Sequence, residues 1–304
     1  NSVIVDLNAY EWKADDWQTP RMEEVVIYQL HVKGFQYNGD GLDYSYGNVF
    51  NDFVETKLDY LEELGVNCIH IMPVSEFPGE DSWGYNTVFF HSMESSYGTA
   101  QDFQRLVDEC HLRGISVIVG IVYNHTAGND NVHYWDFDGT AYSEFGGNGQ
   151  FYYDDERALT FWGPEPNYGA ERTRERLFEN ARMFADLYRV DGFRMDAVGF
   201  VRGESGDGND WFGYQSDEGW QFLRDFNNIV RSYQNGAFMS IAEDIASNPS
   251  ITQNASEGGA GFLSQWAEKN VRDMMANNDD IGRGVNDVRR ILEAYYPVNY
   301  GLFE

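Results

Sequence analysis

The chain has 304 residues, of which 42% are apolar and 16% aromatic, which is enough for one large packed domain, and no apolar run could span a bilayer. Its net charge of −29 comes from 21 basic and 50 acidic residues. Nucleic acid and anionic membrane are therefore disfavoured as partners, because both need a basic face, whereas a neutral ligand such as a sugar is compatible.

Strand-like and helix-like runs alternate after residue 22. Residues 1–22 carry little periodicity and no signal-peptide pattern, so we interpret them as a linker from a preceding domain. We expect a cytoplasmic location, with an extracellular one as the alternative. Strands are predicted at 25–32, 68–74, 115–123, 190–196, 238–243 and, more weakly, 261–266, and helices at 53–64, 100–113, 172–188, 217–233 and 285–295.

This alternation indicates parallel strands joined by right-handed crossovers. A barrel and a doubly wound sheet both fit the pattern. Carboxylates at successive strand ends favour the barrel, because its active site is assembled there. We therefore predict a (β/α)8 TIM-type barrel over 23–304, truncated after about six β/α units. A long insert at 126–171 follows the third strand, and the first and sixth strands would be open edges.

Two strand ends carry candidate catalytic carboxylates. The run Val-Asp-Gly-Phe-Arg-Met-Asp-Ala-Val at 190–198 presents Arg194 and Asp196 on one face, since residues i and i+2 of a strand share a face. An Asp beside a permanent cation stays ionised, which suits a nucleophile. The strand at 238–243 likewise ends in Glu243. Two carboxylates on two strand ends are what glycoside hydrolysis requires; the alternative is a structural ion-pair network.

Other polar and aromatic residues follow the second and third strands. Asn124 and His125 end the third strand, which favours a role in the site. Trp83 and Tyr85 lie in the loop after the second strand, where their rings could stack on sugars or cap the core. We expect all four to bind substrate.

Several acidic and sulfur-containing residues are predicted to be structural. Asp191 is expected to cap the entry of its strand, and strand alternation points Asp244 outward. Cys68 and Cys110 lie in apolar patterns and are expected to be buried free thiols. No Cys/His spacing suggests a zinc site.

Three motifs carry a resemblance to a known family. Val-Tyr-Asn-His at 122–125, Gly-Phe-Arg-Met-Asp-Ala at 192–197 and Ile-Ala-Glu at 241–243 stand in the order found in the α-amylase family, glycoside hydrolase family thirteen, which this chain resembles. The resemblance implies a (β/α)8 barrel and a retaining double displacement on α-glucans such as starch, glycogen and maltooligosaccharides.

The resemblance also implies a role for each matching residue. Asp196 would be the nucleophile and Glu243 the general acid/base. Arg194 and His125 would hold the sugar beside the scissile bond, and Tyr85 would stack under it.

Within the family, two further stretches resemble branching enzymes. These are Met-Pro-Val-Ser-Glu-Phe-Pro at 72–78, leading to Trp-Gly-Tyr at 83–85, and Gly-Gly-Ala-Gly-Phe at 258–262, leading to Trp266. We therefore predict 1,4-α-glucan branching by transglycosylation. An α-amylase-type hydrolase and a non-catalytic glucan-binding protein are the alternatives, and the oligomeric state stays open.

The chain departs from the family pattern at three places. Gly120 stands where the first motif opens with Asp, a carboxylate that helps to orient the arginine. The family's calcium site would use Asn124, but the Lys-His pair that accompanies it is replaced at 198–201, so we expect no metal or other cofactor. None of the 6 histidines precedes an Asp, so the family's third acid is expected to lie beyond this sequence.

Overall fold

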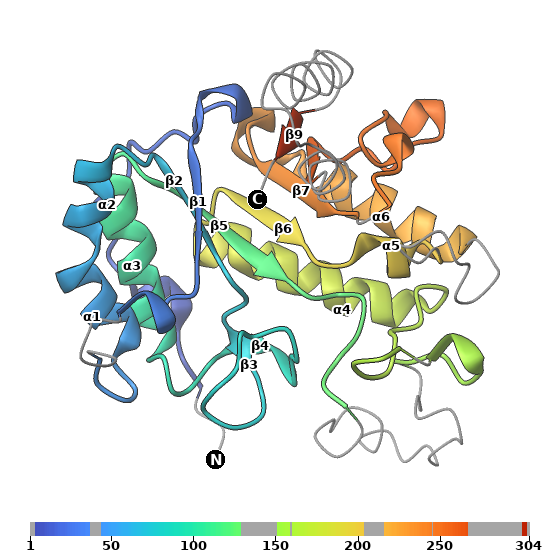
Figure 1. Cartoon of the computed structure of the whole chain (residues 1–304), viewed down its shortest axis with the longest axis horizontal. Coiled ribbons are helices and arrows are strands. Elements are labelled where there is room, and N and C mark those ends of the chain that lie inside the picture. Colours follow the sequence, from blue (N-terminus) through green and yellow to red (C-terminus); the bar gives the residue numbers. More distant parts are fainter. Residues whose placement is uncertain are drawn as a thin grey trace, which may run out of the picture.

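A seven-stranded parallel sheet dominates the computed structural model, which describes residues 4–36, 44–128, 151–158, 160–203, 216–244, 246–266 and 300–302 (Figure 1). The strand order is β1-β2-β5-β6-β7-β8-β9, so neighbours in space are also successive strands of this sheet along the chain. The strands are β1 (Ile27–Leu30), β2 (Cys68–Ile71), β5 (Ser116–Ile121), β6 (Gly192–Met195), β7 (Met239–Glu243), β8 (Ser264–Trp266) and β9 (Tyr300–Leu302). A doubly wound sheet would reverse its order at a switch point. The sequential order therefore confirms the prediction of part of a (β/α)8 barrel.

Six strands were predicted from sequence and lie within one to three residues of their expected ends, whereas β9 was not predicted. Trp266 of β8 pairs with Leu302 of β9, so the expectation that the sixth strand would form an open edge is wrong. Three residues at 300–302 were too few to produce a recognisable strand pattern. A separate antiparallel hairpin of β3 (Ser75–Glu76) and β4 (Phe89–Met93) was also missed.

Helices connect the strands and cover the outer side of the sheet. They are α1 (Val49–Thr56), α2 (Leu58–Leu64), α3 (Ala100–Leu112), α4 (Glu171–Arg182), which continues as the π-helical η5 (Met183–Leu187), α5 (Val198–Val201) and α6 (Asp217–Val230). Short 3₁₀ turns are η1 (Leu7–Ala9), η2 (Met22–Glu24), η3 (Gly34–Gln36), η4 (Glu156–Ala158), η6 (Tyr233–Gly236), η7 (Pro249–Ile251) and η8 (Ala255–Glu257). Figure 1 shows α1 to α3 grouped on one side of the strands, away from α4 to α6.

Local signals set the helix ends. Thr99 and Asp102 form a reciprocal capping box at the start of α3, and Gly114 follows its end with φ 74°. The single helix predicted over 53–64 is two helices, because Lys57 leaves the helical conformation with φ −123°. The helix predicted at 285–295 lies outside the described residues. Within the described part of the chain, no helix is long and apolar enough to cross a membrane.

The two faces of the sheet have different neighbours. Outward-facing side chains such as Ile69, Val119 and Phe193 join the large core shared with the helices. The inward face carries a smaller apolar cluster that includes Cys68 and Ile118. Cys68 and Cys110 are buried and free, as predicted. Strand alternation therefore separates a structural core outside the sheet from an interior that also holds the candidate site residues.

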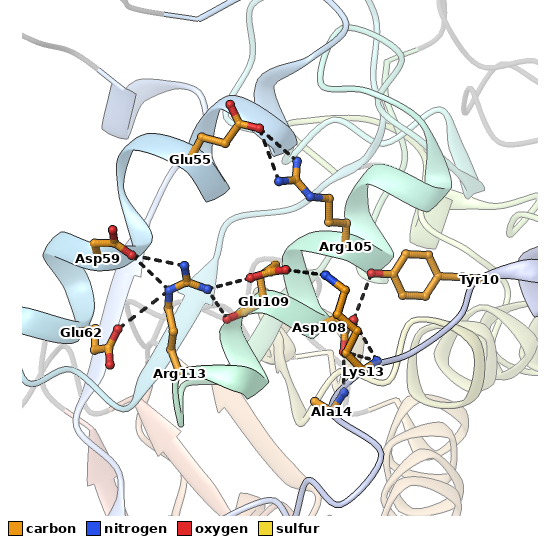
Figure 2. Close-up of polar contacts among 10 residues, drawn as sticks. All are labelled: Tyr10, Lys13, Ala14, Glu55, Asp59, Glu62, Arg105, Asp108, Glu109 and Arg113. Carbon is orange, nitrogen blue, oxygen red and sulfur yellow. Dashed lines mark hydrogen bonds and ion pairs between the residues drawn. The ribbon is translucent and has the colours of Figure 1, made fainter.

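The N-terminal segment packs against α3 (Figure 2). Asp108 accepts hydrogen bonds from the backbone N–H groups of Lys13 at 3.1 Å and Ala14 at 2.9 Å, and from the Tyr10 hydroxyl at 3.1 Å. Trp17 continues this contact by stacking on His111 with ring centroids 4.5 Å apart. The described part of the predicted linker is thus held to the domain by named contacts, and a domain preceding it stays a prediction.

Candidate active site

The end of β6 places an arginine and a carboxylate inside the curled sheet. Gly192 starts β6, and a Cβ at this position would lie only 2.4 Å from the carbonyl oxygen of Met239, so the glycine permits close approach of β7. Arg194 is 3% exposed and its Nη1 donates to Oδ1 of Asp196 at 2.6 Å. The two side chains share one face, as predicted from their spacing.

Glu243 reaches the same guanidinium from β7. Its Oε1 lies 2.6 Å from Nη2 of Arg194, and its Oε2 accepts from the backbone N–H of Ala197 at 2.9 Å. Ala197 has a left-handed φ of 43°, a conformation that costs a non-glycine residue about 1–3 kcal/mol. The strained backbone is therefore located where its N–H holds the second carboxylate. Asp196 and Glu243 thus meet across one arginine.

The surroundings give Glu243 a high proton affinity. Burial raises the pKa of Glu243 to about 7, the charge of Arg194 opposes this rise, and the neighbouring Asp196 adds to it. A hydrogen bond between the two carboxyl groups contributes in the same upward direction. Near neutral pH, Glu243 therefore exists in both protonated and ionised forms, as a group that both donates and accepts a proton requires.

The segment that follows β5 supports Asp196 directly. Asn124 is fully buried, and its Nδ2 donates to the backbone oxygen and to Oδ2 of Asp196, both at 2.9 Å. The amide nitrogen of Asn124 thus fixes this carboxylate, and its predicted contact with substrate stays a prediction. The Oδ1 of Asn124 contacts Nδ1 of His125, and burial lowers the pKa of His125. His125 is therefore neutral at pH 7 and suited to hydrogen bonding rather than to charge pairing.

Tyr85 lies over Arg194 from the loop between β3 and β4. Gly84 has φ 90°, and a Cβ there would lie 2.2 Å from the carbonyl oxygen of Pro73, so only glycine lets the loop lie this close to β2. The Tyr85 ring centroid is 5.5 Å from the guanidinium carbon of Arg194. Trp83, predicted alongside it, is 73% exposed on the same loop. Of the two predicted stacking residues, Tyr85 is the one in contact with the arginine.

Two tryptophans near the site were not among the predicted site residues. Trp266, the last residue of β8, places its ring 4.9 Å from the guanidinium carbon of Arg194. Trp162 is 47% exposed and contacts the His125 ring at 5.3 Å. The position of Trp266 at the end of a strand could have marked it as a site residue from the sequence. Trp162 lies in the irregular insert, where no periodicity marks it.

The described residues do not fit the family's calcium site. Both ends of the Asn124 side chain are engaged by Asp196 and His125. The segment that would supply the accompanying Lys-His pair is α5, whose residues are Val-Gly-Phe-Val. No cluster of three or more His, Cys, Asp or Glu that could hold a metal occurs in the described ranges.

Comparisons with known proteins agree with the three motifs. Residues 52–158 match the alpha-amylase catalytic domain model. The chain is 31% identical over 306 residues to the 1,4-alpha-glucan branching enzyme GlgB of Synechocystis sp., covering 90% of this chain and 39% of that protein. The chain belongs to the α-amylase family. The chain is also 32% identical over 281 residues to the GlgB branching enzyme of Bacillus caldolyticus, covering 90% of this chain and 40% of that enzyme.

Solved structures show the same fold. A putative alpha amylase from Salmonella typhimurium aligns with a TM-score of 0.69 and 26% identity, over 90% of this chain and 41% of that one. An Anoxybacillus alpha-amylase aligns with a TM-score of 0.62 and 23% identity, over 90% of this chain and 59% of that one. The chain spans about two fifths of the length of the curated relatives quoted above. Its family of glycoside hydrolases and transglycosylases is therefore established, and the activity of the whole protein is a matter for proposal.

Proposed function

We propose that the protein containing this chain is a retaining 1,4-α-glucan branching enzyme acting on starch, glycogen or maltooligosaccharides. The observation that carries the proposal is the bridging of Asp196 and Glu243 by one buried arginine, with the pKa of Glu243 raised to about 7. GlgB branching enzymes at about 30% identity over most of the chain support the branching subgroup.

The reaction follows from the different surroundings of the two acids. Asp196, held by Arg194 and Asn124, attacks the anomeric carbon while protonated Glu243 gives its proton to the leaving glycosidic oxygen. A glycosyl ester on Asp196 and a shortened glucan result. Ionised Glu243 then takes a proton from the 6-hydroxyl of a second glucan. That oxygen displaces Asp196 and forms an α-1,6 branch, whereas water at the same step gives hydrolysis.

The geometry required for retention is testable in an experimental structure. A retaining pair needs carboxyl groups about 5–5.5 Å apart, and an inverting pair needs about 6.5–9.5 Å to admit a water molecule. The shared contact with Arg194 supports the shorter range. A separation in the longer range would contradict the double displacement.

The decisive experiment uses the full-length protein with amylose. Branching shifts the iodine stain while few new reducing ends appear, whereas an α-amylase-type hydrolase releases reducing ends in proportion to the change in stain. Asp196→Asn and Glu243→Gln should each reduce kcat by a factor of about 10³ or more, because each removes a group used in bond cleavage. The control is Asp59→Asn, a carboxylate with 86% exposed side chain on α2.

The measurement also tests the remaining alternatives. Reducing ends released in proportion to stain loss would favour the hydrolase, the activity for which the relative from Salmonella typhimurium is named. Maltooligosaccharide binding without turnover would favour the non-catalytic glucan-binding protein. That alternative is motivated by Gly120, which stands where the family motif has an aspartate. Near-normal turnover by Asp196→Asn would overturn its role as nucleophile.

A further inference from the structure

The guanidinium of Arg194 lacks one of its hydrogen-bond partners. Its Nη atoms reach Asp196 and Glu243, but its buried Nε has no hydrogen-bond partner among the described residues. The residue paired with Arg194 on the adjacent strand β5 is Gly120, which has no side chain to offer as acceptor. An unpaired buried donor is unfavourable, so the contacts around the rest of the guanidinium decide how well it is held in place.

The space beside Gly120 is tight for a side chain. A Cβ at this position would lie 3.0 Å from Cδ and 3.2 Å from Cγ of Pro73. A carboxylate side chain here would therefore require a small shift of the proline ring that follows β2. Gly120 supplies no acceptor, and the ring of Pro73 packs against the position where a side chain would begin.

Two aromatic rings flank the arginine instead. The ring centroids of Trp266 and Tyr85 lie 4.9 Å and 5.5 Å from its guanidinium carbon. Trp266 is 6% exposed and pairs in register with Glu243, so the ring and the carboxylate occupy adjacent strands on one face. Cation–π attraction is strongest for tryptophan and is larger when water is excluded.

A second neighbour of Trp266 is a neutral ring. His70 contacts the Trp266 ring edge to face, at 5.4 Å and 80°. Burial and the charge of Arg194 lower the pKa of His70 well below its ordinary value. His70 thus packs against the tryptophan without adding a second positive charge close to the arginine.

We propose that Trp266 is a positioning residue, whose ring face holds Arg194 against Asp196 and Glu243 in place of an acceptor from β5. This inference rests on the proposed function, because it concerns the same pair of acids. Its consequence is that the ring, rather than its indole N–H, is required. A phenylalanine should therefore preserve the function of Trp266 and a leucine should not.

The experiment compares three variants of the full-length protein on amylose across pH. Trp266→Leu should lower kcat about tenfold or more, in line with the loss of a desolvated cation–π contact, with a smaller change in KM. The alkaline limb of the kcat–pH profile of Trp266→Leu should move to higher pH. The charge of Arg194 lowers the pKa of Glu243 in the parent, and this effect weakens when the arginine is less firmly held. Trp266→Phe should stay within about threefold of the parent, since the phenyl face also attracts a cation.

The matched control is Trp220→Leu. Trp220 is 8% exposed and lies 6.0 Å from the guanidinium carbon of Arg202, outside the site. It should lose stability without a shift of the alkaline limb. Identical pH profiles and kcat values for Trp266→Leu and Trp220→Leu would overturn the inference, as would a phenylalanine variant as impaired as the leucine one. A parent without activity on amylose would instead overturn the proposed function.

A second measurement covers the case in which Trp266→Leu fails to fold. The Arg194 Nε–H proton in the folded parent should resonate upfield of the other arginine Nε–H protons in an ¹H–¹⁵N spectrum, because it lies near aromatic ring faces. The same shift, reduced in size, is expected in Trp266→Phe. An Arg194 signal at the ordinary arginine position in the parent would overturn the inference.

Discussion

A buried ion pair next to the site makes the sharpest stability prediction. Arg202 follows α5 and Asp244 follows β7, and both side chains are 0% exposed. The arginine Nε lies 2.9 Å from Oδ2 of the aspartate, and its Nη2 lies 2.9 Å from Oδ1. The pair joins the segment after Asp196 to the residue after Glu243. Strand alternation turns Asp244 away from the site, as predicted.

Arg202→Met removes one partner of this pair. The remaining carboxylate stays in a fully buried position without its cation, and breaking such a pair costs about 3–5 kcal/mol of unfolding free energy. Methionine has nearly the length of the arginine stem, so the packing contribution to this loss is small. The double variant Arg202→Met, Asp244→Leu removes both charges of the pair and should recover most of the loss, because neither member then stays behind without the other.

Urea denaturation of this chain, followed by tryptophan fluorescence, provides the unfolding free energies. The control is Arg182→Met, which breaks a pair with Glu175, whose side chain is 54% exposed, so the loss should be about 1 kcal/mol or less. A loss below about 1 kcal/mol for Arg202→Met would refute the reasoning. So would a double variant no more stable than the single one, because the cost would then not arise from an unpaired charge.

Three further predictions concern the framework around the site. Asp108→Ala should speed tryptic cleavage after Lys13 in limited proteolysis, because it removes the acceptor that ties the N-terminal segment to α3, and an unchanged rate would contradict that tie. Gly192→Ala should lower the unfolding free energy measured in urea by about 2 kcal/mol or more, since its Cβ would lie 2.4 Å from a backbone oxygen of β7. An unchanged unfolding free energy would show that the two strands separate freely. Burial raises the pKa of both Cys68 and Cys110, so neither thiol should react with Ellman's reagent until the chain unfolds, and rapid labelling of the native protein would count against their burial.

Much of the framework was predictable because its signals are local. Buried strands carry continuous apolar runs, helices carry capping residues, and alternation along a strand decides which side chains share a face. These patterns placed Arg194 and Asp196 together and put Glu243 at the end of the next strand. The break at Lys57 was missed because the apolar spacing continues across it.

The contacts that complete the site depend on residues distant in sequence. Pairing of β8 with β7 brings Trp266 beside Arg194, and Pro73 packs closely against Gly120 of β5. Neither contact leaves a periodic trace, because each depends on how strands far apart in the chain pack. Local chemistry along the sequence thus determined which side chains enter the barrel interior, and only tertiary packing decided what holds them there, since hydrogen bonds and ring contacts depend on distances that the chain order does not specify.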